Sequence, residues 1–110
     1  GRSMGGRMCS MAIADKEDPL VVAGLVLVSY PLHPPKKPET LRIEHLPRVA
    51  VPTLCVSGTK DNFGTPQELE EAFAVVPGAV TWSWVDNGRH ELAKADADVA
   101  LRIATWVRAL

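Results

Sequence analysis

The chain has 110 residues, with 12 lysines and arginines against 13 aspartates and glutamates, and 46% of its residues are hydrophobic. This composition is typical of an ordinary soluble globular domain, and the length allows one domain at most. The formal net charge of −1 gives no electrostatic reason to expect nucleic acid or an anionic membrane as a partner. The longest apolar run, 20–28, is too short to span a bilayer.

The two cysteines, Cys9 and Cys55, exclude a disulfide scaffold and a cysteine-rich zinc site. They lie far apart in the sequence and form no C-x-x-C pair. Such sparse use of cysteine suits a reducing compartment, so we expect a cytoplasmic protein. Because both fall within apolar segments, we also expect both side chains to be buried in the core.

Helix-like and strand-like segments alternate from the start of the chain. Residues 6–14 are apolar nearly all round, which predicts a short buried helix. Residues 21–30 form a continuous β-branched run, which is typical of a strand buried on both faces in a parallel sheet. The proline-rich segment 31–38 suits neither helix nor sheet, and 39–49 holds a short helical turn at best.

The second half of the chain continues this alternation. Further strands are predicted at 51–57 and 79–85, and a final helix at 96–110 has apolar side chains at helical spacing. We expect this helix to cover the third strand. The three tryptophans are then expected to be core residues at that contact: Trp82, Trp84 and Trp106.

A capping box marks the start of the remaining helix. Thr65 and Glu68 have the spacing at which each side chain can bond to the other's backbone N–H, and Pro66 takes the first helical position. The predicted buried stripe follows at Leu69, Ala72, Phe73 and Val76.

Strands that alternate with helices predict the α/β class, with a parallel sheet sandwiched between helices. Three strands are few for such a sheet, and the chain opens on Gly1-Arg2-Ser3 without an initiator methionine. We therefore expect residues 1–110 to be a partial domain, the second half of a fold with its N-terminal strands missing.

The first residues match G-x-S-x-G, with Ser3 between Gly1 and Gly5. In this motif the serine lies at a sharp strand-to-helix turn that raises its hydroxyl above the sheet. The N–H of the next residue, Met4, then points at a developing oxyanion. An alternative interpretation is that residues 1–3 are an expression remnant in front of a native Met4.

Asp61 and His90 follow the second and third predicted strands. Sites assemble at the carboxyl edge of a parallel sheet, and the order serine, acid, histidine is the one that this serine motif requires. Ser3, Asp61 and His90 therefore form a candidate catalytic triad. His90-Glu91 begins an H-E-x-x-H pattern, but Lys94 takes the position of the second ligand, so we expect no metal site.

Tyr30 and His33 follow the first strand and are candidates for lining the mouth of the pocket, because loops at strand ends often carry function. The alternative is that Tyr30 packs in the interior and that His33 is a loop residue held by its neighbouring prolines.

Together these motifs resemble the C-terminal half of an α/β-hydrolase. The similarity is to the dienelactone-hydrolase-like branch, which holds the testis-expressed hydrolase-like proteins and a subunit of the NSL histone-acetyltransferase complex. The segments that carry the resemblance are 1–7, 29–35, 51–54, 57–61 and 87–90. It implies Ser3 as nucleophile, His90 as general base and then acid, and Asp61 as the group that orients His90. Met4 would be one oxyanion donor.

We therefore expect a serine hydrolase that cleaves a small-molecule ester or related acyl bond through an acyl-enzyme, without a cofactor. The segment between the first two strands is too short for a cap domain, which indicates an open site. The alternative is a non-catalytic binding module in a protein complex, because a fold alone does not grant a function. The 110-residue chain by itself is expected to fold poorly and to lack activity.

Overall fold

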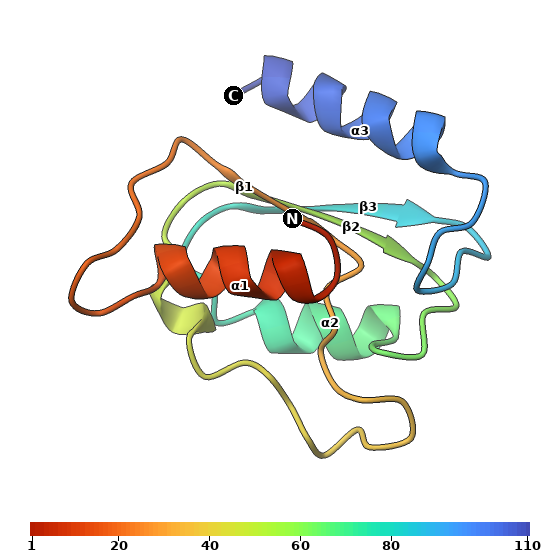
Figure 1. The fold of residues 1–110 in the computed structure, drawn as a ribbon, viewed down its shortest axis with the longest axis horizontal. Coiled ribbons are helices and arrows are strands. Elements are labelled where there is room, and N and C mark those ends of the chain that lie inside the picture. Colours follow the sequence, from red (N-terminus) through yellow and green to blue (C-terminus); the bar gives the residue numbers. More distant parts are fainter.

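The computed structural model describes all 110 residues, and helices and strands alternate as the sequence predicts (Figure 1). The three strands form one parallel sheet in the order β1-β2-β3. The predicted fold class, three parallel strands flanked by helices, is therefore confirmed. In chain order the elements are α1 (Met4–Ile13), β1 (Leu25–Val28), the 3-10 helix η1 (Leu46–Arg48), β2 (Thr53–Gly58), α2 (Pro66–Phe73), β3 (Val80–Val85) and α3 (Asp96–Arg108).

The sheet lies between two layers of helices, with α1 and α2 on one face and α3 on the other (Figure 1). The larger core cluster fills the α1 and α2 side and includes Leu27 and Cys55. The smaller cluster lies under α3 and includes Val28 and Val56. Because neighbouring residues of a strand point to opposite faces, a sheet covered on both sides has continuous apolar strands.

β1 is shorter than the sequence predicts. Its ladder with β2 begins with Leu25 opposite Thr53 and ends with Val28 opposite Val56. Val21, which lies in the predicted strand, is 93% exposed. A β-branched run favours extended backbone, but it becomes a strand only where a neighbouring strand offers backbone partners.

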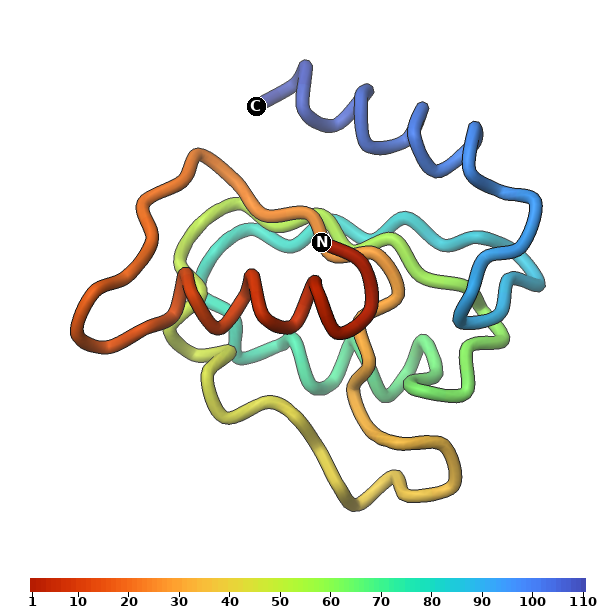
Figure 2. Tube along the Cα trace, in the orientation of Figure 1, coloured from red at the N-terminus to blue at the C-terminus, as the bar shows by residue number.

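Residues Gly1–Ser3 run alongside β1 in the parallel direction (Figure 2). The Gly1 backbone nitrogen donates to Val26 O at 2.7 Å, and Val28 N–H donates to Gly1 O at 2.9 Å. Ser3 N–H then donates to Val28 O at 2.7 Å. The residues that precede α1 are therefore part of the sheet layer, as a strand-to-helix turn requires.

α1 is buried on one side only, so the prediction of an all-round buried helix is wrong. Ser10 and Ile13 face the interior, whereas Met8 is 47% exposed. Cys9 is exposed as well, and its predicted place in the core is wrong, while Cys55 is buried as predicted. A helix in an outer layer turns one face to the sheet, whatever the polarity of its other face.

The three tryptophans do not meet at one contact, which corrects a second prediction. Trp82 and Trp84 stack with ring centroids 4.9 Å apart and pack against the core on the α1 and α2 side. Trp106 packs against the opposite core, under α3. The two-residue period of β3 places Trp82 and Trp84 on one face and Val85 on the other.

The capping box of α2 is confirmed. Thr65 Oγ1 accepts a hydrogen bond from Glu68 N–H at 3.2 Å, and Glu68 Oε1 accepts one from Thr65 N–H at 3.0 Å. Of the four residues in the predicted stripe, Leu69, Phe73 and Val76 are buried and Ala72 is half-buried. No helix of the structure combines the length and apolar character needed to cross a membrane.

Candidate active site

The structure brings Ser3, His90 and Asp61 together in one hydrogen-bonded chain. Ser3 Oγ lies 2.7 Å from His90 Nε2, and His90 Nδ1 lies 2.9 Å from Asp61 Oδ2. Because a carboxylate only accepts hydrogen bonds, Nδ1 carries the proton and Nε2 is free to accept the serine proton. The three residues come from the turn before α1, the loop after β2 and the loop after β3.

Ser3 has a backbone conformation that L-residues rarely adopt, with φ at 51° and ψ at −125°. The backbone segments of this turn approach each other closely at two of its glycines. A Cβ on Gly1 would lie 2.7 Å from the backbone of Gly5, and a Cβ on Gly6 would lie 2.9 Å from Gly1 O. A Cβ on Gly5 would meet nothing within 4 Å. The close approach therefore needs Gly1 and Gly6, and the second glycine of the motif is not sterically required.

Asp61 is a buried carboxylate with both oxygens engaged. The residue is 3% exposed, and Oδ1 accepts a hydrogen bond from Phe63 N–H at 2.8 Å while Oδ2 faces His90. A buried charge is tolerated when it is paired and hydrogen-bonded, and both conditions are met here.

Phe63 belongs to the site, although its sequence gives little sign of it. Its ring stacks on the imidazole of His90, with centroids 4.0 Å apart and planes 28° apart. This contact restricts rotation of the ring that lies between Ser3 and Asp61. The available signal was the Asx-turn pattern, in which an aspartate accepts a hydrogen bond from the N–H two residues later.

The loops that carry Asp61 and His90 are pressed together at Gly58 and Gly88. A Cβ on Gly58 would lie 2.1 Å from Gly88 O, a distance that no real structure allows. Lys60 N–H donates to the same Gly88 O at 2.8 Å. This backbone-to-backbone contact fixes the separation of the two loops, and with it the hydrogen bond between the acid and the histidine.

Gly58→Ala is therefore expected to lower the free energy of unfolding by about 1–3 kcal/mol, because backbone must move to admit the methyl group. The measurement is denaturant unfolding of the full-length protein. Gly5→Ala is the matched control, because its methyl group would meet nothing and alanine favours helix by about 1 kcal/mol. Equal stability of the Gly58→Ala variant and the wild type would contradict the expected clash.

Arg2 links the serine turn to the histidine loop. Its guanidinium donates to Glu91 O and lies 3.7 Å from the Asp96 carboxylate at the start of α3. The sequence offered no sign of this link, because the partners of Arg2 come from the far end of the chain.

Met4 begins α1 directly after Ser3. The first N–H groups of a helix have no partner within it, and the Ser3 side chain does not cap them. The Met4 N–H therefore lies next to the serine hydroxyl in sequence and is free of intrahelical bonding.

A polar cavity of about 370 Å³ borders this site. His90 lines it, together with two cationic and two other polar side chains: Lys60, Arg89, Asn62 and Glu91. The structure holds no cluster of three or more histidine, cysteine, aspartate or glutamate side chains placed to bind a metal ion.

The family model of the alpha/beta hydrolase domain matches residues 1–107. The chain belongs to this family. Because the match includes Gly1–Ser3, it does not support the interpretation of those residues as an expression remnant. Membership agrees with the strand-to-helix turn at Ser3 and with the parallel sheet.

Solved structures of α/β-hydrolases have the same fold. The esterase domain of a Rhodothermus marinus protein superposes with a TM-score of 0.73 at 17% identity, over 99% of this chain and 58% of its own. A predicted CIB-like hydrolase from Thermoplasma acidophilum superposes with a TM-score of 0.71 at 24% identity, over 100% of this chain and 49% of its own. The α/β hydrolase MGS-MChE2, from a lagoon-sediment metagenome, superposes with a TM-score of 0.71 at 18% identity, over 99% of this chain and 59% of its own. At these identities the likeness concerns the fold, and the chain spans between 49% and 59% of these structures.

Tyr30 lies in the interior of this hydrolase domain and lines none of its cavities. It is 1% exposed, its hydroxyl donates to Arg42 O at 2.7 Å, and its ring meets Phe73 edge-on. Burial raises the pKa of Tyr30 to about 12. In this structure the side chain packs, as the alternative interpretation holds.

His33 is also buried and is paired with a carboxylate on α2. Its Nε2 lies 3.1 Å from both oxygens of Glu68, and its Nδ1 lies 2.8 Å from Pro34 O. Burial opposes protonation, but these two hydrogen bonds outweigh it and raise the pKa of His33. Hydrogen bonds from Thr65 and His33 lower the pKa of Glu68. The backbone N–H of His33 donates to Phe63 O at 3.0 Å. The His33–Glu68 pair therefore supports the loop whose Phe63 ring stacks on His90.

Glu68→Gln is expected to destabilise the protein by about 1 kcal/mol within a limited pH range. Because the pKa of folded His33 is raised, its contribution is complete below the ordinary value of 6.5 and is lost as the pH rises through the folded value. Because the pKa of folded Glu68 is lowered, its contribution is complete above 4.5 and is lost as the pH falls through the folded value. Unfolding between pH 4.5 and 9 measures the effect, which should be largest between pH 5 and 6.5 and smallest at pH 9.

Glutamine can still form the capping box, and Glu70→Gln on exposed helix surface is the control. A pH-independent effect would contradict the pairing.

Proposed function

We propose that the protein is a serine hydrolase that cleaves an ester or related acyl bond. Ser3 is the nucleophile, His90 the general base and then general acid, and Asp61 the group that orients His90. The observation that carries the proposal is the continuous chain of contacts, 2.7 Å from Ser3 Oγ to His90 Nε2 and 2.9 Å from His90 Nδ1 to Asp61 Oδ2. Membership of the alpha/beta hydrolase domain family supports it.

In this mechanism Ser3 Oγ attacks the carbonyl carbon of the substrate while its proton passes to His90 Nε2. The carbonyl π electrons move to oxygen and form the tetrahedral oxyanion. When the oxyanion collapses, the bond to the leaving alcohol breaks and His90 returns its proton to that oxygen. Water then attacks the acyl-enzyme in the same way, with His90 as base, and releases the acid and free Ser3.

Asp61 contributes by stabilising the imidazolium that forms in each half-reaction. Its carboxylate is buried and accepts the Nδ1–H of His90, which also fixes the tautomer that exposes a bare Nε2. Phe63 holds the ring plane by stacking. The base is therefore oriented before substrate binds, which is the condition for efficient proton transfer.

The Met4 N–H is proposed as one donor to the oxyanion. It is the first N–H of α1 and directly follows Ser3, whose backbone φ is positive. The positive end of the helix dipole acts in the same direction as this donor.

The proposed substrate is a small-molecule ester. We place the protein in the dienelactone-hydrolase-like branch that its sequence resembles. The segment between β1 and β2 holds only the 3-10 helix η1, so no cap domain is inserted there. An open site with a polar border suits a small or presented ester. Two proteins of similar fold, an esterase domain from Rhodothermus marinus and a predicted hydrolase from Thermoplasma acidophilum, are compatible with this proposal.

The full-length protein tests the proposal in two measurements. It should hydrolyse p-nitrophenyl acetate, and a fluorophosphonate probe should label it, with the label mapped to Ser3 by peptide mass spectrometry. A folded protein that neither turns over the ester nor takes the label would overturn the proposal and favour a non-catalytic binding module.

A further inference from the structure

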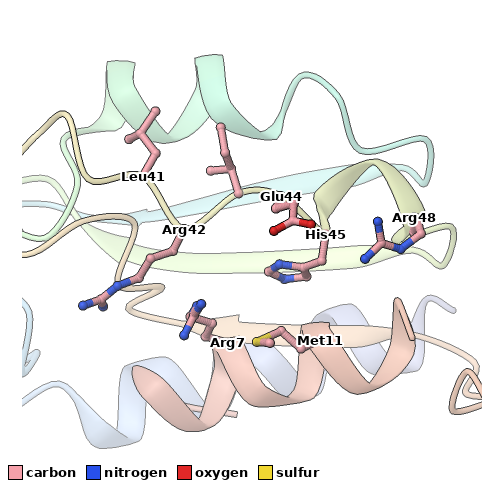
Figure 3. Close-up of a pocket in the computed structure, with 8 residues that line it drawn as sticks. Arg7, Met11, Leu41, Arg42, Glu44, His45 and Arg48 are labelled. Atoms are coloured by element: carbon pink, nitrogen blue, oxygen red, sulfur yellow. The ribbon is translucent and has the colours of Figure 1, made fainter. Parts of the chain in front are cut away.

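A second polar pocket lies between α1 and the segment 41–48 (Figure 3). Its volume is about 280 Å³, and none of the residues that line it belongs to the candidate active site. The lining residues that matter here are Arg7 and Met11 from α1, Arg42, Glu44 and His45 from the loop between β1 and η1, and Arg48 from η1.

The charges of this pocket are unbalanced. Three guanidinium groups, from Arg7, Arg42 and Arg48, line it beside a single carboxylate, that of Glu44. None of the three arginines forms an ion pair, as is also true of Arg89 and Arg108, but only these three line one pocket together. Three positive charges beside one carboxylate repel one another, and an anion bound near them would reduce that repulsion.

Backbone contacts hold two of the arginines in place and leave donors free. Arg48 Nε donates to Ala14 O at 2.8 Å, and Arg42 Nη1 donates to Pro31 O at 3.3 Å. A guanidinium carries five N–H donors in a fixed fork, so each side chain keeps several that can face a ligand. Both side chains are thus positioned by the fold before any ligand arrives.

Arg7 has one donor that no protein group satisfies. Its Nε is buried and has no hydrogen-bond acceptor in the structure. Buried donors are almost always satisfied, and one without a protein partner can be completed by a water molecule or an ion. Figure 3 shows the Arg7 guanidinium on the α1 side of the pocket, between Arg42 and the ring of His45.

His45 lies in the same electrostatic environment as these arginines. Ser10 Oγ donates to Arg7 O at 2.7 Å and lies 2.7 Å from His45 Nε2, so it accepts the Nε2–H of the ring. Burial, Arg7 and Arg48 all lower the pKa of His45, and Glu44 opposes them. An anion that binds beside these arginines would raise the pKa of His45.

We propose that this pocket is a binding site for an oxyanion, a phosphate or carboxylate group, which Arg7 and Arg42 hold, while Arg48 adds positive charge from the far side of His45 (Figure 3). Guanidinium groups match both anions with paired N–H donors. The site is independent of the proposed hydrolase chemistry, since it shares no residue with Ser3, Asp61 or His90. It is linked to that region through α1, where the backbone N–H of Arg7 donates to Ser3 O at 3.1 Å, and through Arg42, whose backbone N–H donates to Leu32 O at 2.9 Å.

The test titrates the full-length protein with inorganic phosphate or with acetate, while sodium chloride keeps the ionic strength constant. The readouts are the melting temperature and the pKa of His45 from NMR of the imidazole protons. Saturable stabilisation and a raised His45 pKa are expected. A response to phosphate alone identifies a phosphate site, and a response to both anions identifies a general oxyanion site.

Variants assign the effect to this pocket. Arg42→Gln should weaken phosphate binding by at least about tenfold, Arg48→Gln should weaken it less, and Glu44→Gln should strengthen it. Arg108→Gln, on the exposed last turn of α3, is the matched control and should bind as the wild type does. Arg7→Gln is not needed, so a folding defect of that variant leaves the test intact. No saturable response, or equal losses in Arg108→Gln and Arg42→Gln, would overturn the proposal.

Discussion

Replacing Ser3 with alanine in the full-length protein is expected to reduce ester turnover by about 10⁶-fold and to abolish fluorophosphonate labelling. The variant removes the oxygen that lies 2.7 Å from His90 Nε2, so the base has no proton to accept. Because the members of a triad act as a unit, loss of the nucleophile alone costs about as much as loss of all three. Steady-state rates with p-nitrophenyl acetate and mass-spectrometric detection of the label measure the effect.

Ser10 offers an unusually close control for this experiment. Its Oγ also lies 2.7 Å from a histidine Nε2, that of His45. The pair differs in chemistry, because Ser10 is fully buried and already donates to Arg7 O, and no carboxylate accepts a hydrogen bond from His45. Ser10→Ala should therefore retain labelling and turnover. Labelling that survives in Ser3→Ala, or that disappears equally in Ser10→Ala, would contradict the assignment of the nucleophile.

The architecture was predictable because its signals are local. The capping box at Thr65 and Glu68 specifies where α2 begins through bonds within four residues. The continuous apolar runs at β1 and β2 indicate burial on both faces, and thus a parallel sheet between helices. The length of β1 was not predictable, because it depends on which residues of a distant segment lie opposite Leu25 and Val28.

The burial of α1 shows where local reasoning ends. Cys9 lies in an apolar helix in the sequence and yet is exposed, because only one side of that helix meets the sheet. The placement of Trp82 and Trp84 has a similar cause. The face of β3 that they share is turned to α2 rather than to α3. Composition gives the polarity of a segment, while its neighbours decide which side is covered.

For the site, chain order and strand ends were enough to select Ser3, Asp61 and His90 as candidates, and the structure brings them together. The residues that position them were not predictable. Phe63 and Arg2 act through a ring stack and a link to the far end of the chain, neither of which has a sequence signature. The three arginines of the second pocket likewise come from segments with no shared motif.

Asp61→Asn is expected to reduce turnover by about 10⁴-fold while leaving the fold intact. The asparagine oxygen can keep the hydrogen bond from Phe63 N–H, now 2.8 Å from Asp61 Oδ1, so the loop retains its support. Its NH₂ group would then face His90 Nδ1 and favour the opposite tautomer. With the proton on Nε2, His90 can no longer accept one from Ser3. The rate of ester hydrolysis and the rate of fluorophosphonate labelling should fall together.

Asp98→Asn is the control for this substitution. Asp98 pairs with Arg102 on the half-exposed surface of α3, so it tests the loss of a carboxylate outside the site. That variant should keep wild-type rates, because exposed ion pairs contribute at most about 1 kcal/mol to stability and this one touches no proposed catalytic residue. If Asp61→Asn retained turnover within about tenfold of the wild type, His90 would not depend on the acid for its tautomer. The contact of 2.9 Å between His90 Nδ1 and Asp61 Oδ2 would then be structural rather than part of the mechanism.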